Sequence, residues 1–130
     1  MANCLVLIDI QYGFLNNKTQ HIPYRLQQLV KTHDFDHVVA TEFRNTQDSP
    51  YVEFLGWNGL MDEEEQQLAD EIADLAEQIF VKNGYSCCTN DFVEYLYLNK
   101  IDRIYLAGVD TEACVLKSAM DAFEQVYLVQ

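Results

Sequence analysis

The sequence predicts an α/β fold with a mainly parallel sheet of about five strands and helices on both of its faces. Short apolar segments typical of strands alternate along the chain with segments whose apolar residues recur every three or four positions, as on one face of a helix. The first of them, CLVLIDI at residues 4–10, is apolar almost throughout, which is typical of a strand buried on both faces. No repeat, low-complexity segment or linker divides the chain, so we expect a single domain over residues 1–130 with right-handed crossovers.

The individual elements follow from these patterns in chain order. Residues 22–30 are expected as a helix, because Pro23 suits a first turn and apolar residues recur on one side. Residues 62–78 are also expected as a helix, whose acidic start DEEE suits a helix N-terminus and faces solvent. A further helix is capped by Thr89 or Asn90 and ends near residue 98. The strands are expected at residues 4–10, 37–41, 79–81, 103–107 and 126–129.

A long segment at residues 43–59, FRNTQDSPYVEFLGWNG, separates the second strand from the acidic helix. A segment of this length is usually functional or disordered. Its aromatic residues argue against disorder. We expect a folded loop that either walls a pocket or only packs against the body of the protein.

Composition and charge narrow the classes of partner. The chain has 130 residues, of which 49% are hydrophobic and 22% are charged, enough for a compact core. With 8 basic and 21 acidic residues its net charge is −13, so we expect neither nucleic acid nor an anionic membrane as partner. No apolar run reaches membrane-spanning length and no signal-peptide pattern is visible, which favours a cytoplasmic protein. The cysteines at positions 4, 87, 88 and 114 form no metal-binding pattern and are interpreted as reduced thiols.

The segment IYLAGVDTEACVLKSAMDAF at residues 104–123 predicts a nucleophile. A strand ends at Gly108 and a helix follows, with Thr111 as its expected N-cap and Cys114 in its first turn. Backbone N–H groups and the partial positive charge of a helix N-terminus stabilise a thiolate, the nucleophilic form of cysteine. The alternative is a cysteine that is merely buried, as free cysteines usually are.

Two further groups are expected beside this sulfur. Asp9 lies near the end of the first strand and Lys82 ends the third, and ligands bind at the carboxyl ends of parallel strands. Asp9 could act as general base, and the Lys82 ammonium would favour a thiolate and a developing oxyanion. Backbone N–H groups of Asp110 and Cys114 are candidates for an oxyanion hole. By itself, Asp9 could equally be an ordinary aspartate at a strand end.

Three motifs together resemble the isochorismatase-like cysteine hydrolases, which include nicotinamidases and related amidases. The resemblance extends over essentially the whole chain, in order. The motifs are LVLIDIQYGFL with Asp9, Gln11 and Phe14, FVKNGYS with Lys82, and LAGVDTEACV with Gly108, Val109, Thr111 and Cys114.

The resemblance implies a three-layer Rossmann-like sandwich and a catalytic triad of Asp9, Lys82 and Cys114. It also implies a cis peptide bond between Val109 and Asp110. The reaction it implies is attack by the cysteine on an amide carbonyl, proton transfer through Asp9 to the leaving amine, and hydrolysis of the resulting thioester. The presence of the cysteine favours hydrolysis of a C–N bond over cleavage of a vinyl ether.

The chain departs from the family pattern in two places. The zinc-dependent nicotinamidases carry histidines after the second strand, where this chain reads TEFRNTQDSPYV, so we expect no metal and no other cofactor and doubt nicotinamide as substrate. Members of the family also continue past the fifth strand, whereas this sequence stops at Gln130. We therefore expect a missing sixth strand, and residues 126–130 either frayed or covered by a second chain in a homo-oligomer, a dimer or higher.

The substrate is expected to be a small molecule whose identity the sequence leaves open. One alternative is a thiol-based redox sensor that uses Cys87 and Cys88, which follow Lys82 closely and could lie near the pocket rim. Another is a catalytically impaired subunit kept for assembly or binding. The residues expected to line the substrate pocket are Gln11, Phe14, Phe43, Arg44, Trp57 and Tyr85.

Overall fold

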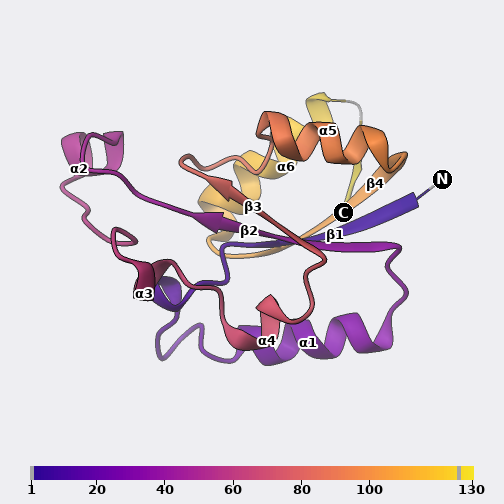
Figure 1. Cartoon of the computed structure of the whole chain (residues 1–130), viewed down its shortest axis with the longest axis horizontal. Coiled ribbons are helices and arrows are strands. Elements are labelled where there is room, and N and C mark those ends of the chain that lie inside the picture. The colour runs from indigo at the N-terminus through magenta and orange to yellow at the C-terminus, as the bar shows by residue number, and fades with distance from the viewer. Residues whose placement is uncertain (1, 126) are drawn as a thin grey trace.

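The computed structural model describes residues 2–125 and 127–130 and contains a five-stranded parallel sheet. The strand order is β3-β2-β1-β4-β5, with β1 at the centre (Figure 1). The predicted α/β class with a parallel sheet is therefore confirmed. The strands are β1 (Ala2–Ile8), β2 (His37–Phe43), β3 (Gln78–Lys82), β4 (Ile101–Gly108) and β5 (Leu128–Val129).

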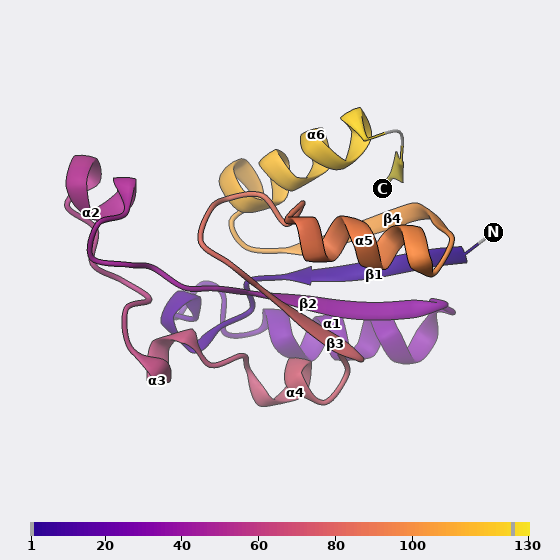
Figure 2. The same ribbon diagram turned by 45° about the horizontal axis from the view of Figure 1, so that its top comes forward.

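Helices cover both faces of the sheet and make the molecule a three-layer sandwich. In Figure 2, α1 (Ile22–Thr32) and α4 (Asp70–Ala73) lie below the strands, and α5 (Asn90–Leu98) and α6 (Leu116–Glu124) lie above them. Within the described residues, none of these helices has the length and apolar character that crossing a bilayer requires.

The central strand explains why its sequence is apolar almost throughout. Alternate β1 residues belong to separate core clusters: Val6 packs with the side chains of α5 and α6, and Leu7 packs with those of α1 and α4. Both side chains are fully buried. Because successive side chains of a strand point to opposite faces, a strand covered on both sides needs apolar residues at every position.

The expected helix at residues 62–78 is wrong in its extent. The structure has two short helices there, α3 (Glu63–Gln66) and α4, and Gln67 between them is extended. Leu68 and Ala69 are buried, and the Ala69 N–H donates to the Ile10 carbonyl at 2.9 Å. Pairing with the chain after β1 therefore outweighs the helical preference of this acidic segment.

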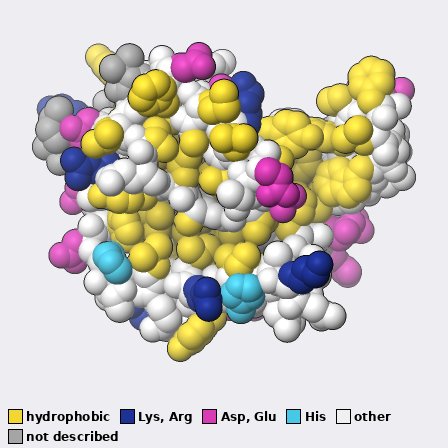
Figure 3. Space-filling model, turned by 180° about the vertical axis from the view of Figure 1, so that it is seen from behind, with side chains coloured by type: hydrophobic (Ala, Val, Ile, Leu, Met, Phe, Trp, Pro, Cys, Tyr) yellow, Lys and Arg dark blue, Asp and Glu magenta, His cyan; other side chains and the backbone are white. Residues whose placement is uncertain are grey.

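The segment at residues 43–59 is folded, as expected, but it contains a helix. Helix α2 (Pro50–Leu55) is capped by Ser49, whose hydroxyl accepts from the Val52 N–H at 3.2 Å, and ends at Gly56 in the left-handed region. It stands out from the sheet as a separate lobe (Figures 1 and 3). Phe54 is 84% exposed on this lobe.

The last strand is shorter than expected. It covers Leu128–Val129, which pair with Arg103 and Ile104 of β4, and Gln130 extends the pairing through its backbone. Residues 128–130 are thus hydrogen-bonded to the sheet rather than frayed, and the part of the expectation that concerns Val126 lies outside the described residues.

Candidate active site

The chemistry-bearing residues meet at the carboxyl edge of the sheet. Asp9 directly follows β1, Lys82 is the last residue of β3, and the turn that carries Cys114 follows β4. Because all strands run parallel, these ends lie on one side of the molecule.

Asp9 and Lys82 form a buried ion pair. The Lys82 Nζ lies 2.8 Å from the Asp9 Oδ2, and both side chains are almost completely buried. The ammonium also donates to the carbonyls of Gly84 at 2.8 Å and Tyr85 at 3.0 Å. The attraction of the opposite charges offsets part of the cost of burying both groups.

Thr41 orients Asp9 from the neighbouring strand. Its hydroxyl donates to the Asp9 Oδ1 at 2.7 Å and accepts from the Asp9 N–H at 3.1 Å. Asp9 itself has a φ of 55°, a left-handed conformation that aspartate tolerates better than most residues. The sequence reasoning missed Thr41, because its role depends on the pairing of Ile8 with Thr41 across β1 and β2.

The turn after β4 places the sulfur. Gly108 has a φ of +153°, and a Cβ there would lie 2.2 Å from the Ile8 carbonyl oxygen, so only glycine lets β4 and β1 approach this closely. The Val109–Asp110 peptide bond is cis. Asp110 occupies the N-cap position and makes no side-chain cap, so the expectation that Thr111 caps the helix is wrong.

Cys114 lies in a π-helical turn, η2 (Thr111–Val115), that precedes α6. The Asp110 carbonyl accepts from the Val115 N–H at 3.0 Å, which closes this wide turn. Cys114 is therefore in the turn before the α-helix rather than in its first turn.

The surroundings of the sulfur keep it protonated. Burial raises the pKa of the Cys114 thiol to about 12, and the charge of Asp9 and a hydrogen bond to that carboxylate add to the effect. Lys82 and a backbone hydrogen bond from Asp110 oppose it. The expectation that the turn stabilises a thiolate is thus wrong for the resting protein, because burial and the nearby carboxylate outweigh the positive groups.

Asp9 is the group that can take the thiol proton. Burial raises the pKa of its carboxyl, while the Lys82 charge and hydrogen bonds from Lys82, Cys114 and Thr41 lower it. Because this carboxylate accepts a hydrogen bond from the thiol, it is placed to receive the thiol proton.

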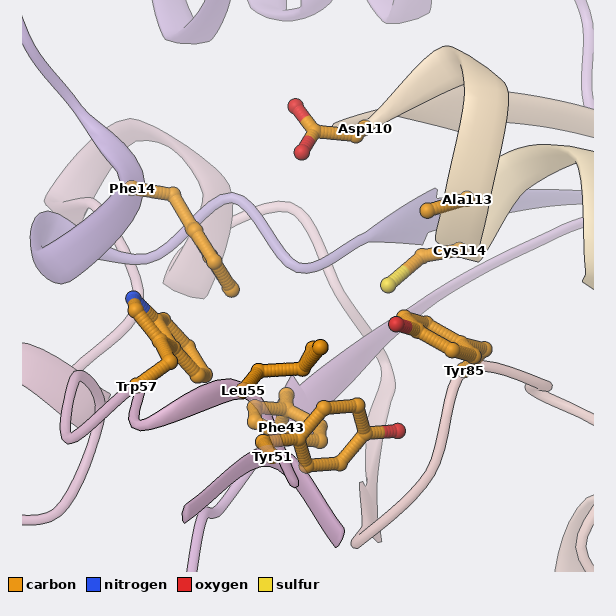
Figure 4. Close-up of a pocket in the computed structure, with 9 residues that line it drawn as sticks. All are labelled: Phe14, Phe43, Tyr51, Leu55, Trp57, Tyr85, Asp110, Ala113 and Cys114. Carbon is orange, nitrogen blue, oxygen red and sulfur yellow. The ribbon is translucent and has the colours of Figure 1, made fainter. Parts of the chain in front are cut away.

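The sulfur faces a pocket of about 190 Å³ between the turn and the α2 lobe (Figure 4). Phe14 and Trp57 stack at 6.1 Å between ring centres, and the ring of Tyr51 meets that of Tyr85 edge-on at 5.2 Å. The lining residues are Phe14, Phe43, Tyr51, Leu55, Trp57, Tyr85, Asp110, Ala113 and Cys114.

Two residues expected in the pocket lie elsewhere. Gln11 is fully buried, and its amide bonds to both backbone groups of Phe43, at 2.8 and 2.9 Å, and to the Gln66 carbonyl at 2.7 Å. Arg44 pairs with Glu42 at 2.7 Å and lies in a separate acidic depression. Gln11 therefore joins segments of the fold, and Arg44 is unavailable to a substrate in the pocket.

Three lining residues were missed, Tyr51, Leu55 and Ala113, the last of which directly precedes Cys114. Tyr51 and Leu55 come from α2. The sequence carries the signals of this short helix, because Ser49 can act as N-cap, Pro50 suits the first turn and Gly56 can end the helix.

Cys87 and Cys88 do not line the pocket. The Cys87 N–H donates to the Ser118 hydroxyl at 2.9 Å, below α6. The two thiols hydrogen-bond to each other. This hydrogen bond raises the pKa of Cys87, and burial raises it further. The same hydrogen bond lowers the pKa of Cys88. Their place under a helix does not favour the redox alternative.

A metal does not fit the described residues. Among residues 2–125 and 127–130, no group of three histidine, cysteine, aspartate or glutamate side chains is arranged to hold an ion.

Comparison with known proteins assigns the family. The isochorismatase domain matches residues 3–130, nearly the whole chain. This chain belongs to the isochorismatase family. Isochorismatase family protein 1A of Dictyostelium discoideum is 40% identical over 52 residues, a match that covers 38% of this chain and 25% of that protein.

Solved structures share the fold of this isochorismatase-family chain at low identity. N-carbamoylsarcosine amidase from Thermoplasma acidophilum superposes with a TM-score of 0.86 at 22% identity, covering 99% of this chain and 80% of that one. An isochorismatase-like hydrolase from Alkaliphilus metalliredigens gives 0.85 at 21% identity, covering 99% and 79%. These likenesses show the fold.

Proposed function

We propose that this protein is a cysteine hydrolase that cleaves the C–N bond of a small amide-like substrate. The observation that carries the proposal is the Asp9 carboxylate, which contacts the Lys82 ammonium and the Cys114 thiol beside an open pocket. Family membership and the fold shared with an amidase support it.

In the proposed reaction, Asp9 removes the thiol proton as the Cys114 sulfur attacks the carbonyl carbon. This coupling matters because the thiol does not ionise by itself near neutral pH. Backbone N–H groups of Asp110 and Cys114 would stabilise the oxyanion, and the contact of Asp110 with the sulfur supports this assignment.

The tetrahedral intermediate then collapses and its C–N bond breaks. Asp9 returns the proton to the leaving nitrogen, which departs as a neutral amine or ammonia, and a thioester remains on Cys114. Asp9 next removes a proton from water, which attacks the thioester, and the sulfur leaves and takes that proton back. The charge of Lys82 favours the ionised form of Asp9 between these proton transfers, and its contact holds the carboxyl group in place.

The proposal is tested by an activity screen of small primary amides, ureides and carbamates. The wild-type protein should release amine or ammonia from some of them, and Cys114→Ala should release none. Cys88→Ala is the matched control, because it removes a half-buried thiol that does not line the pocket and should keep the activity. Labelling of Cys88 by an electrophilic substrate analogue, with Cys114 unreactive, would contradict the proposal.

We further propose that the protein self-associates and acts in a reducing, cytoplasmic compartment. The exposed apolar lobe around α2 supports the first, and the unpaired state of the cysteines at 4, 87, 88 and 114 supports the second.

A further inference from the structure

The pocket is lined by aromatic rings and one charged group. Of its nine lining residues, five are aromatic, and only Asp110 carries a formal charge at neutral pH while the thiol is protonated. The faces of aromatic rings are electron-rich and attract cations. In Figure 4, Asp110 lies at one side of the pocket, across from Tyr51 and Leu55.

Among the described residues, no basic side chain lines the pocket, although the Lys82 ammonium lies behind it, 5.3 Å from the centre of the Phe43 ring. Arg44 is held by Glu42 in another depression, and the Lys82 ammonium is engaged by Asp9 and by backbone carbonyls. An anionic substrate would therefore enter a site whose only fixed lining charge has the same sign, on a molecule with a net charge of −13.

We propose that the substrate is a small amide that carries a positively charged ammonium group. This inference rests on the proposed hydrolase function. The amide carbon would lie at Cys114, and the cation would lie among the rings of Phe14, Trp57 and Tyr51 with Asp110 as its counter-ion. The pocket volume of about 190 Å³ is below the roughly 300–1,000 Å³ of drug-sized sites, so the cation must be compact.

The test uses amides that share the reacting group and differ in charge. Trimethylammonioacetamide is the cation, 3,3-dimethylbutanamide is its neutral isostere, and succinamate is an anion of similar size. We expect kcat/KM for the cation to exceed that for the neutral isostere by about tenfold, which lies between the scales of an exposed and a desolvated cation–π contact. The anion should be the poorest substrate.

Variants show whether the proposed groups make the difference. Asp110→Asn and Trp57→Leu should each lower the ratio of cation to neutral kcat/KM. Glu112→Gln is the matched control, since it removes one exposed carboxylate two residues away that does not line the pocket, and it should leave the ratio unchanged. Calorimetry of both amides with Cys114→Ala measures the same preference as dissociation constants, without turnover.

The outcomes separate this inference from the function on which it rests. The inference is overturned, and the proposed hydrolase function is left intact, if both amides are hydrolysed with a cation-to-neutral ratio of kcat/KM near one. The same holds if Asp110→Asn and Glu112→Gln change that ratio equally. Preferred binding of the cation by Cys114→Ala without hydrolysis by the wild-type protein supports the inference about the pocket and counts against the hydrolase. Equal binding of both amides without hydrolysis contradicts both.

Discussion

At the scale of the residue, Asp9 balances burial against three stabilising contacts. Burial raises the pKa of its carboxyl, whereas Lys82, Cys114 and Thr41 lower it. In the proposed reaction, the first contact supplies charge, the second supplies the proton that is moved, and the third holds the carboxylate in position. The proposed activity therefore depends on a base whose ionisation is set by its neighbours.

The pH dependence of kcat/KM should report this balance. Asp9 accepts a proton only when it is ionised, and its pKa lies above the ordinary 3.8, so activity should be lost as the pH falls through that raised value. Thr41→Val removes a hydrogen bond that lowers this pKa, so the acid limb should move to higher pH. The shift is measured from initial rates between about pH 4 and pH 9. This range of about five units is chosen around the reference pKa values of carboxyl and thiol groups.

Thr46→Val provides the control for this experiment. It makes the same chemical change at an exposed position of the loop after β2, and its acid limb should coincide with that of the wild-type protein. An acid limb of Thr41→Val that stays in place or moves to lower pH would refute the role given to Thr41.

At the scale of the element, the approach of β4 to β1 holds the turn that carries Cys114 in place. The Val109 N–H donates to the Ile8 carbonyl at 3.1 Å, immediately before Asp9. Gly108 lies against the same carbonyl. The strand ends that lead to Asp9 and to Cys114 are thus joined by this backbone contact, which any side chain at Gly108 would disturb.

Gly108→Ala should lower the free energy of unfolding by about 3 kcal/mol or more, because its Cβ meets backbone atoms that cannot move aside. Gly84→Ala adds the same methyl group at a position with no atom within 4 Å and should change the free energy by less than about 0.5 kcal/mol. Urea unfolding followed by circular dichroism compares the two. Equal stabilities of the variants would show that the close contact is unimportant.

The elements also show what the sequence could predict. Periodicity located the strands and α1 and α5 because each buries a face of its own, and the cap at Thr89 agrees with the structure. It failed at residues 62–78, where the pairing of Gln11 with Leu68 depends on a remote segment. It also missed α2, although the end signals of that helix were present.

Sequence reasoning anticipated that three chemistry-bearing side chains lie at one edge of the sheet, and it did not anticipate the electrostatics there. Asp9, Lys82 and Cys114 were placed together because parallel strands bring their ends to one edge. The raised pKa of Cys114 depends on how deeply the sulfur is buried and on its contact with Asp9, and spacing along the chain fixes neither. Gln11 shows the same limit: it belongs to the motif but bonds to Phe43 and Gln66.

At the scale of the whole molecule, an exposed apolar lobe and a high negative charge oppose each other. Phe54 and Leu55 on α2 are 84% and 69% exposed, and the lobe stands away from the body (Figure 3). A patch of this kind favours association. The net charge of −13 disfavours contact between identical chains. Which effect prevails depends on how well the charges are screened.

The proposed self-association should therefore strengthen as salt is added. Raising the ionic strength from about 0.01 M to about 0.15 M shortens the screening length from about 30 Å to about 8 Å, which weakens repulsion between acidic chains and leaves apolar contact in place. Sedimentation velocity over a range of protein concentrations should show a lower dissociation constant at the higher salt.

Phe54→Ser should raise the dissociation constant of self-association about tenfold or more, since it removes a large apolar side chain from the lobe. Tyr97→Ser is the matched control, because Tyr97 is 78% exposed on α5, away from the lobe, and its loss should leave association unchanged. A protein that stays monomeric at every salt and protein concentration would contradict the proposal, and equal effects of the two substitutions would place the interface away from α2.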